Sequence, residues 1–459
     1  MQDRPVPENK MGVMPVNRLL ITMALPLAIS MLVQALYNIV DSIYVSRIVT
    51  AVDSSALTAV SLAFPIQNLM IAVASGTSVG VNALLSRSLG EKNQDRANLA
   101  AGNGILLAVA GAVLFLLFGL FGSVSFMRSQ TDIPEILASG EAYLQIVTVF
   151  SGFVFLEIML ERLLQSTGRT MLSMITQGLG AILNIVLDPV FIFGYFGIPA
   201  MGVAGAAVAT VVGQACAMLL ALYFNLRKNP EVGFGLRYLR PRAGIIGTIY
   251  AVGIPSIIMM SIGSVMTYTM NRILMGFTNV ATAVFGAYFK LQSFVFMPVF
   301  GLNNALIPIV AYNYGARKPQ RITQALKLAA MYASALMFLG IALFQLAPDK
   351  LLMLFDPSEN MMRIGVRALR VISISFLFAG FCIVAGGVFQ AMGKGMYSVY
   401  VSVSRQLVVL LPVAFLFSLT GNLDLVWLAF PIAELASLGM SVFCLRRIYT
   451  RLIRPMYQS

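Results

Sequence analysis

Long apolar runs follow one another along the whole chain, and they restrict its possible folds more than any other feature. A helix needs about 20 apolar residues to cross the hydrocarbon core of a bilayer. Twelve runs of roughly that length or more can be placed, at 17–46, 57–84, 98–126, 136–160, 170–195, 202–226, 245–275, 280–310, 325–347, 364–390, 397–418 and 424–446. Only 11% of the residues are charged, against about 25% in a soluble domain. The sequence therefore predicts an all-α integral membrane protein with twelve transmembrane helices.

The first apolar run follows a short polar segment, residues 1–16, and continues for nearly thirty residues. The apolar core of a signal peptide is about 7–15 residues long and is followed by a small-residue cleavage site, which this run lacks. We therefore expect the first run to remain in the membrane as a transmembrane helix.

The chain contains no histidine and three scattered cysteines, Cys216, Cys382 and Cys444. Without histidine the sequence has no Ser-His-Asp triad, no usual proton shuttle and none of the commonest metal ligand. The cysteines have neither the spacing of a metal site nor that of a disulfide framework. A membrane-embedded enzyme is therefore disfavoured, and we expect no enzymatic activity and no cofactor.

A tandem repeat relates the two halves of the chain at a shift of 225 residues. The heptapeptide QSTGRTM at 165–171 falls on QAMGKGM at 390–396, and Gln67 falls on Gln292. An even number of spans in each half makes the halves parallel, and transport sites commonly form where such repeats meet. We expect an N-terminal segment 1–16, an N-lobe 17–226, a linker 227–243, a C-lobe 244–447 and a C-terminal tail 448–459.

Basic residues are distributed unequally between alternate loops. With the N-terminus in the cytoplasm, the loops and ends on that side hold 23 Lys and Arg and the opposite side holds 6, while Arg272 and Lys290 lie within spans. Such an excess is typical of cytoplasmic loops. Topology therefore explains the formal net charge of +13. Both termini are predicted to be cytoplasmic, and a nucleic-acid partner is not needed.

Two aspartates fall inside apolar runs of the N-lobe, where a carboxylate costs roughly 2.5–3.5 kcal/mol even on a lenient insertion scale. Asn184 and Asp188 have i, i+4 spacing, as do Tyr37 and Asp41, so each pair shares one helix face. Pro189 follows Asp188 and frees backbone carbonyls for other partners. Two such carboxylates can share a proton, or they can bind Na⁺ together with other oxygen ligands. Alternatively, each meets a buried polar partner and has no role in transport.

The other charged residues inside spans have simpler explanations. Glu157 lies within helical reach of Arg162 and is expected to form an ion pair with it, whereas Glu434 stands alone and has no counterpart in the repeat. Arg272 and Lys290 are long enough to extend to a membrane interface. The seventh and tenth spans contain no carboxylate.

Together these features resemble the multidrug and toxic compound extrusion (MATE) family over essentially the whole chain. The resemblance rests on the twelve spans in two halves, an aspartate in the first span, NIVLDP in the fifth, and the loops RSLGEKN, LQSTGRTMLS and FQAMGKGM. It implies a V-shaped pair of six-helix bundles around a central cavity. It also implies a multidrug efflux antiporter that exports amphipathic, often cationic drugs against H⁺ or Na⁺ by alternating access. Such a protein is expected to work as a monomer in the cytoplasmic membrane of a bacterium or archaeon.

The resemblance also implies roles for individual residues. Its cation site corresponds to Asp41, Asn184, Asp188 and the hydroxyl of Thr210, with Tyr37 as a neighbour, and this site would bind H⁺ or Na⁺ in competition with the substrate. Pro26 and Pro189 are candidate helix hinges. Candidates for the substrate cavity are Met259, Met260, Met266, Lys290, Gln67 and Gln292, because flexible methionines suit varied ligands, although they also fill ordinary helix contacts.

Other transport functions remain open at this point. A flippase for lipid-linked oligosaccharides, from the same superfamily, would need several basic residues in its cavity to bind pyrophosphate, and the spans contain few. A channel or receptor is also compatible with the helices, but the two-half repeat favours alternating access.

Overall fold

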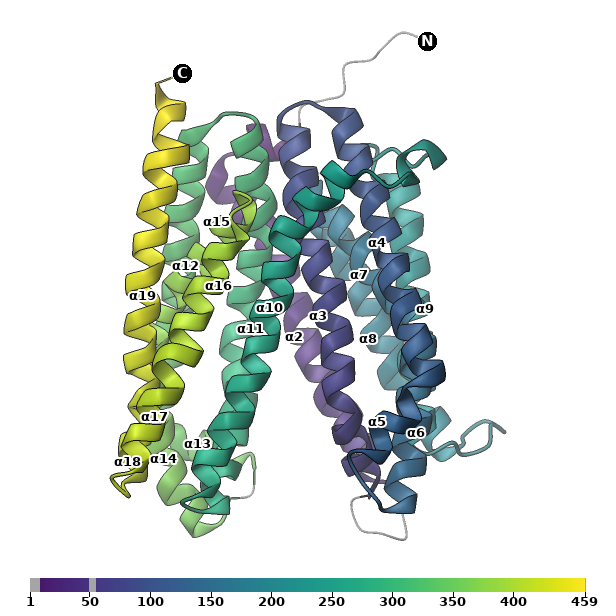
Figure 1. Ribbon diagram of the computed structural model, residues 1–459, viewed down its shortest axis with the longest axis vertical. Coiled ribbons are helices and arrows are strands. Elements are labelled where there is room, and N and C mark those ends of the chain that lie inside the picture. The colour runs from purple at the N-terminus through teal and green to yellow at the C-terminus, as the bar shows by residue number, and fades with distance from the viewer. Residues whose placement is uncertain (1–8, 49–54, 356, 459) are drawn as a thin grey trace. The chain divides into compact units, whose positions relative to one another are not determined.

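The computed structural model describes residues 9–48, 55–355 and 357–458, and the regular structure in these ranges is helical (Figure 1). Ten of the described helices are long and apolar enough to cross a membrane, or up to twelve if two bent helix pairs each count as one span. The predicted all-α membrane fold is therefore confirmed.

The chain forms two compact units. The N unit comprises the described residues of Ile29–Leu89 and Asn93–Gly253, and the C unit comprises those of Met1–Ala28, Gly90–Lys92 and Ile254–Ser459. The division falls inside two helices, α2 (Val16–Ser46) and α10 (Ala243–Met275), just after Pro26 and just before Pro255. These two helices therefore contribute residues to both units. The lobes expected on either side of the 227–243 linker are halves of the sequence, and their boundaries stay a prediction.

Small residues allow the helices of the N unit to pack closely. Besides its parts of α2 and α10, this unit contains α3 (Ser55–Gly90), α4 (Gln94–Phe121), α5 (Ser123–Arg128), α6 (Pro134–Val149), α7 (Ser151–Ser166), α8 (Thr170–Phe193), α9 (Val203–Lys228) and the 3-10 helix η1 (Leu236–Leu239). Gly104 lies against Val81 and Met159, and Gly111 lies against Phe155. Close approach at glycine is a common way for transmembrane helices to associate.

Aromatic rings form much of the core of the C unit. Its helices are α1 (Lys10–Val13), α11 (Asn279–Gly315), α12 (Pro319–Leu346), α13 (Pro348–Met353), α14 (Glu359–Ser373), α15 (Phe376–Ala391), α16 (Gly395–Val403), the π-helix η2 (Ser404–Leu410), α17 (Leu411–Ser418), α18 (Leu423–Trp427), α19 (Ala429–Ile448), the π-helix η3 (Tyr449–Ile453) and the 3-10 helix η4 (Arg454–Tyr457). The ring of Phe285 lies 4.7–6.4 Å from those of Tyr288, Phe289, Trp427 and Phe430, measured between centroids. Such contacts contribute both apolar burial and specific geometry.

The helix boundaries follow the predicted repeat. Adding 225 to the bounds of α4 and α5 gives the bounds of α12 and α13, and α8 maps in the same way onto the stretch from α16 to α17. The bent pair α6 and α7, with an angle of 47°, corresponds to α14 and α15, with an angle of 50°. Gly168 and Gly393 also correspond, and both have positive φ, 86° and 72°, which glycine adopts without strain. The two halves therefore share one chain path.

Both described ends of the chain lie at the same end of the C unit. Arg321 on α12 donates to the carbonyl oxygens of Met11 and Met14, at 3.0 and 2.6 Å. The hydroxyls of Thr323, also on α12, and Tyr457 lie 3.2 Å apart. An even number of spans requires this arrangement.

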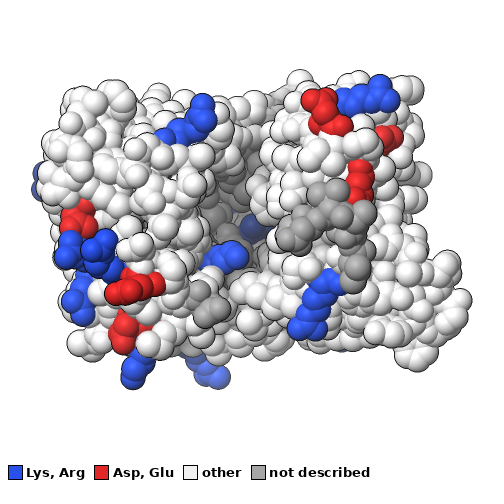
Figure 2. All heavy atoms as spheres, turned by 90° about the horizontal axis from the view of Figure 1, so that it is seen from below, with Lys and Arg blue, Asp and Glu red and all other residues white. Residues whose placement is uncertain are grey.

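The face away from the labelled termini carries scattered side chains of both charges on a largely uncharged surface (Figure 2).

Candidate functional site

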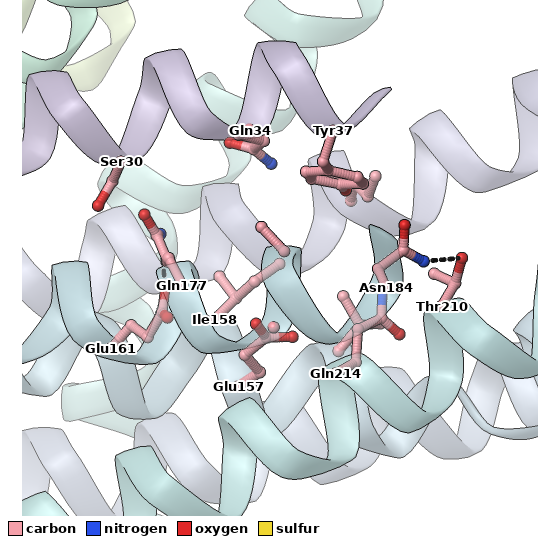
Figure 3. Close-up of a pocket in the computed structure, with 14 residues that line it drawn as sticks. Ser30, Gln34, Tyr37, Glu157, Ile158, Glu161, Gln177, Asn184, Thr210 and Gln214 are labelled. Atoms are coloured by element: carbon pink, nitrogen blue, oxygen red, sulfur yellow. Dashed lines mark hydrogen bonds between the residues drawn. The ribbon is translucent and has the colours of Figure 1, made fainter. Parts of the chain in front are cut away.

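A polar cavity lies within the N unit, among α2, α7, α8 and α9 (Figure 3). It contains about 720 Å³ of empty space, including the part that is open to the outside. The polar side chains that line it are Ser30, Gln34, Tyr37, Glu157, Glu161, Gln177, Asn184, Thr210 and Gln214. Polar and ionisable residues inside a transmembrane bundle commonly mark a functional site.

Asn184 and Asp188 lie one turn apart on α8, and only 3% and 0% of their surfaces are exposed. The amide of Asn184 is 3.1 Å from the hydroxyl of Thr210 on α9 (Figure 3). When its nitrogen faces Asp188, the amide donates to Oδ2 of that residue at 3.1 Å, and its oxygen accepts from the Thr210 hydroxyl at 3.1 Å. This orientation satisfies both ends of the amide. The structure thus brings together three of the predicted site residues.

Asp41 on α2 approaches the same group. Its carboxyl group lies within hydrogen-bonding reach of the carboxyl group of Asp188. One oxygen of each carboxyl, Oδ1, is buried and has no hydrogen-bond partner among the described residues. Two ionised carboxylates in contact repel each other, so a proton or a cation between them is needed. The residues present therefore fit either H⁺ or Na⁺.

Two tyrosines border this carboxyl pair. Tyr37 lines the cavity and precedes Asp41 by one turn on α2. The hydroxyl of Tyr143 donates to Oε1 of Gln67 at 3.4 Å. Gln67, a candidate for the substrate cavity, is thus held by a tyrosine and is not among the residues that line this cavity.

Sequence reasoning overlooked a second acidic pair, Glu157 and Glu161 on α7. Glu157 lines the cavity. Glu161 is 3% exposed and accepts hydrogen bonds from the hydroxyl of Thr176 and the amide of Gln177, both at 2.7 Å. The i, i+4 spacing of two glutamates in VFLEIMLERLL was the available signal, because that spacing places both on one helix face.

Among the described residues, Arg162 is not paired with Glu157 as expected but contacts other neighbours. Arg162 donates to Oε1 of Gln165 at 2.9 Å and has Glu161 as its charged neighbour. Glu157 instead faces the cavity. The prediction failed because several acceptors on and beside α7 lie within reach of one long arginine side chain.

A second cavity lies within the C unit and contains about 590 Å³ of empty space, including its open part. Met266 on α10 and Gln292 on α11, two candidates for the substrate cavity, line it, and their role in substrate binding stays a prediction. Arg405 and Glu434 also line it, and Arg405 Nη1 lies 3.4 Å from Glu434 Oε2. One expectation is corrected here: Glu434 does not stand alone, because it lies beside Arg405 of the η2 segment.

Comparison with known families decides the classification of the chain. A family model described as MatE matches residues 26–190 and 255–416, which include most of both halves. The chain belongs to the MatE family. This agrees with the resemblance inferred from its motifs.

Curated relatives of this MatE protein span almost the same length. It is 27% identical over 427 residues to the multidrug export protein MepA of Staphylococcus saprophyticus, covering 92% of each chain. It is also 27% identical over 437 residues to MepA of Staphylococcus haemolyticus, covering 94% of this chain and 93% of the relative.

Solved structures support the MatE fold. An outward-facing multidrug resistance MATE transporter superposes with a TM-score of 0.91, at 24% identity and 99% coverage of both chains. A MATE protein in a straight conformation superposes with a TM-score of 0.91, at 24% identity, and the match covers 99% of this chain and 100% of the other. A MATE protein in a bent conformation superposes with a TM-score of 0.88, at 24% identity, and the match covers 97% of both chains.

Some candidates for the substrate cavity of this MatE protein line neither of the two cavities: Met259, Met260, Lys290 and Gln67. Met260 is 43% exposed on α10. The ammonium of Lys290 lies 6.0 Å from the centroid of the Phe355 ring, within the range of a cation–π contact. A role of these residues in substrate binding stays a prediction.

Proposed function

We propose that this MatE protein is a secondary active multidrug efflux antiporter that exports amphipathic, often cationic compounds in exchange for H⁺ or Na⁺. The observation that carries the proposal is the contact of the Asp41 and Asp188 carboxyl groups in the N unit, next to a polar cavity. The names of the MepA relatives, multidrug export proteins, support the same function.

The charge of the N-unit cavity favours organic cations as substrates. Glu157 and Glu161 line it, and the residues that line it include no Lys or Arg. A cavity wall of one sign concentrates ligands of the opposite sign. A flippase for pyrophosphate-linked sugars would need basic residues at such a position, so this observation favours the antiporter over the flippase.

Competition at the carboxyl pair would couple ion entry to drug export. H⁺ or Na⁺ bound by Asp41 and Asp188 cancels negative charge that would otherwise attract a cationic substrate, so release of the ion favours loading of the drug. In the Na⁺ case the oxygens of Asp41, Asp188, Asn184 and Thr210 would hold the ion, a set of hard ligands suited to it. The site needs no other cofactor.

Helix α2 is suited to transmit the change. It carries Tyr37 and Asp41 in the N unit, and it enters this unit from the C unit at Ile29, three residues after Pro26. A proline inside a helix removes a backbone hydrogen bond and permits bending. We infer that Pro26 is a hinge for alternating access and that Pro189, next to Asp188, gives α8 similar freedom.

The proposed setting is the cytoplasmic membrane of a bacterium or archaeon, with the protein acting as a monomer. Both described ends of the chain lie at one end of the C unit, and the excess of Lys and Arg in alternate loops supports a cytoplasmic location of that end. Cysteine accessibility at position 10 or 457, measured from each side of the membrane, tests this orientation.

Efflux under separately imposed gradients tests the proposed antiport. Proteoliposomes or whole cells would be loaded with ethidium, and a proton gradient or a sodium gradient would be applied alone. We expect one gradient to drive efflux and Asp41→Asn and Asp188→Asn to abolish it. Asp132→Asn, which changes an exposed acid of the same unit, is the matched control. Efflux by Asp41→Asn at the parent rate, with normal membrane insertion, would rule out this mechanism.

A further inference from the structure

The cavity of the C unit combines an acid, a base and aromatic walls. Arg405 and Glu434 lie in its lining together with the rings of Tyr288, Phe289, Phe296 and Phe430. Ionisable residues inside a membrane bundle are rare, and each is a candidate functional group by default. The N-unit cavity, in contrast, has only acidic residues among its charged lining residues.

The ion pair in this cavity is loosely made. Its single contact, Arg405 Nη1 to Glu434 Oε2, is 3.4 Å long, whereas charge-assisted contacts are usually about 2.7–2.9 Å. The surface pair Arg367–Asp424 of the same unit is 2.8 Å long. A guanidinium has five N–H donors, and the Arg405 side chain is 33% exposed. Arg405 can therefore offer further donors to a ligand.

Glu434 also has unused bonding capacity. Its side chain is only 7% exposed, and its Oε1 atom is buried without a hydrogen-bond partner among the described residues. A buried carboxylate oxygen in that state is costly, because its hydration is lost and nothing replaces it. A ligand ammonium group placed in the cavity would supply the missing donor.

The backbone at Arg405 is specialised as well. Ser404–Leu410 forms a π-helical segment, η2, and single π-turns inside α-helices are frequent at functional sites. The equivalent stretch of the N unit belongs to the continuous α-helix α8, with Gly180 at the position of Arg405. Of these two equivalent stretches, the one that carries the arginine is the π-helical one.

We propose that the C-unit cavity is a second ligand site, which binds aromatic zwitterions. Arg405 binds the carboxylate of the ligand, Oε1 of Glu434 accepts from its ammonium group, and the surrounding rings, including Tyr288 and Phe430, contact its aromatic body. This site lies apart from the cation site proposed in the N unit. The biological purpose of this site rests on the proposed export function. Ligand binding at the site does not, because binding needs no ion gradient.

Three probes with one fluorophore test the proposal: Nε-dansyl-lysine, a zwitterion; dansylcadaverine, a cation; and dansylglycine, an anion. Each is titrated into the purified full chain in lipid nanodiscs without a gradient. We expect dansyl-lysine to bind tightest at the C-unit site. Arg405→Gln and Glu434→Gln should each weaken its binding about tenfold or more, the loss expected when one charged partner is removed. Arg367→Gln, at the surface pair, should leave binding unchanged.

The outcomes separate ligand binding from structural support. If Arg405→Gln weakens all three probes equally, the pair only supports the fold and the proposal is overturned. The double variant Arg405→Gln/Glu434→Gln leaves no unpaired buried charge, so it should insert even where single variants do not, and it should lose the preference for dansyl-lysine. The proposal is also overturned if the double variant keeps that preference. It is overturned likewise if the wild-type protein binds the zwitterion no better than the other two probes. Asp41→Asn should leave dansyl-lysine binding intact. A failure of the C-unit site is therefore distinguishable from a failure of the antiport mechanism.

Discussion

The two cavities of this MatE protein occupy equivalent halves of a repeat, yet their charges differ. The N-unit cavity has Glu157 and Glu161 in its wall and the contacting pair Asp41 and Asp188 beside it, whereas the C-unit cavity pairs an acid with a base. At the repeat shift of 225 residues Asp188 falls on Val413. The shared helices therefore determine where a cavity lies, and a few substitutions determine the charge of its wall.

This difference suggests a division of labour. Acids in contact without a base need an exchangeable cation, so their charge depends on what is bound. An acid beside an arginine already has its counter-ion, so the C-unit cavity keeps its charge balance without one. Ion coupling is accordingly assigned to the N unit, and the C unit is assigned to ligand recognition.

The largest effect is expected from neutralising one acid in each unit. Asp41→Asn should abolish ethidium efflux, because the carboxyl pair then cannot exchange a cation. Glu434→Gln should leave ethidium efflux within about twofold of the parent, since Glu434 is predicted to serve zwitterions. Initial efflux rates, normalised to the amount of protein in the membrane, measure both. Equal losses in the two variants would remove the distinction between the units.

Helix packing within each unit offers a second comparison. Gly301 on α11 faces Ala28 on α2 in the C unit, and an added Cβ at Gly301 would lie 2.5 Å from the backbone nitrogen of Ala28. The equivalent contact in the N unit pairs Gly76 with Gly253, and a Cβ at Gly253 would lie 3.2 Å from the carbonyl oxygen of Gly76. Gly253→Ala therefore reproduces the combination that the C unit already has.

We accordingly expect Gly301→Ala to destabilise the protein by about 1–3 kcal/mol, the usual cost of overpacking, and Gly253→Ala to cost clearly less. Gly263→Ala is the control on α10, because nothing lies within 4 Å of an added Cβ there. The fraction of monodisperse protein that remains after heating in detergent measures the difference. If Gly301→Ala and Gly253→Ala lose similar fractions of monodisperse protein, the distance between the two helices does not determine whether a methyl group is tolerated.

The sequence predicted the fold far better than the C-unit site. Apolar run length and the 225-residue shift predicted the helices, since both follow from bilayer thickness and simple alignment. The i, i+4 spacing of Asn184 and Asp188 likewise predicted their shared face. The Arg405–Glu434 pair was missed because the two residues lie far apart in the sequence, and no linear pattern indicates a π-helical turn. Periodicity also cannot show which bundle the ends of α2 and α10 join, because apolar residues occur on all faces of these helices.

The support of Asp188 by its neighbours gives a third, smaller effect. Asn184→Ala removes the amide that can donate to Asp188 at 3.1 Å, and a buried acceptor that loses its donor costs about 1–3 kcal/mol. We expect the concentration of coupling ion needed for half-maximal efflux to change about tenfold. Gln214→Ala, which changes another polar residue of the cavity wall, is the control. An unchanged ion dependence would show that the amide does not tune the pair.

The smallest effect should come from the wall of the C-unit cavity. Met266 lines that cavity and Met260, on the same helix, does not. Methionine adapts its shape to a ligand, whereas leucine has a similar volume but is stiffer. We therefore expect the exchange to weaken ligand binding only slightly. Met266→Leu should weaken dansyl-lysine binding by about two- to threefold, and Met260→Leu should not change it. If Met260→Leu has the larger effect, the zwitterion binds outside this cavity, and the contrast in charge between the two units does not set their ligands.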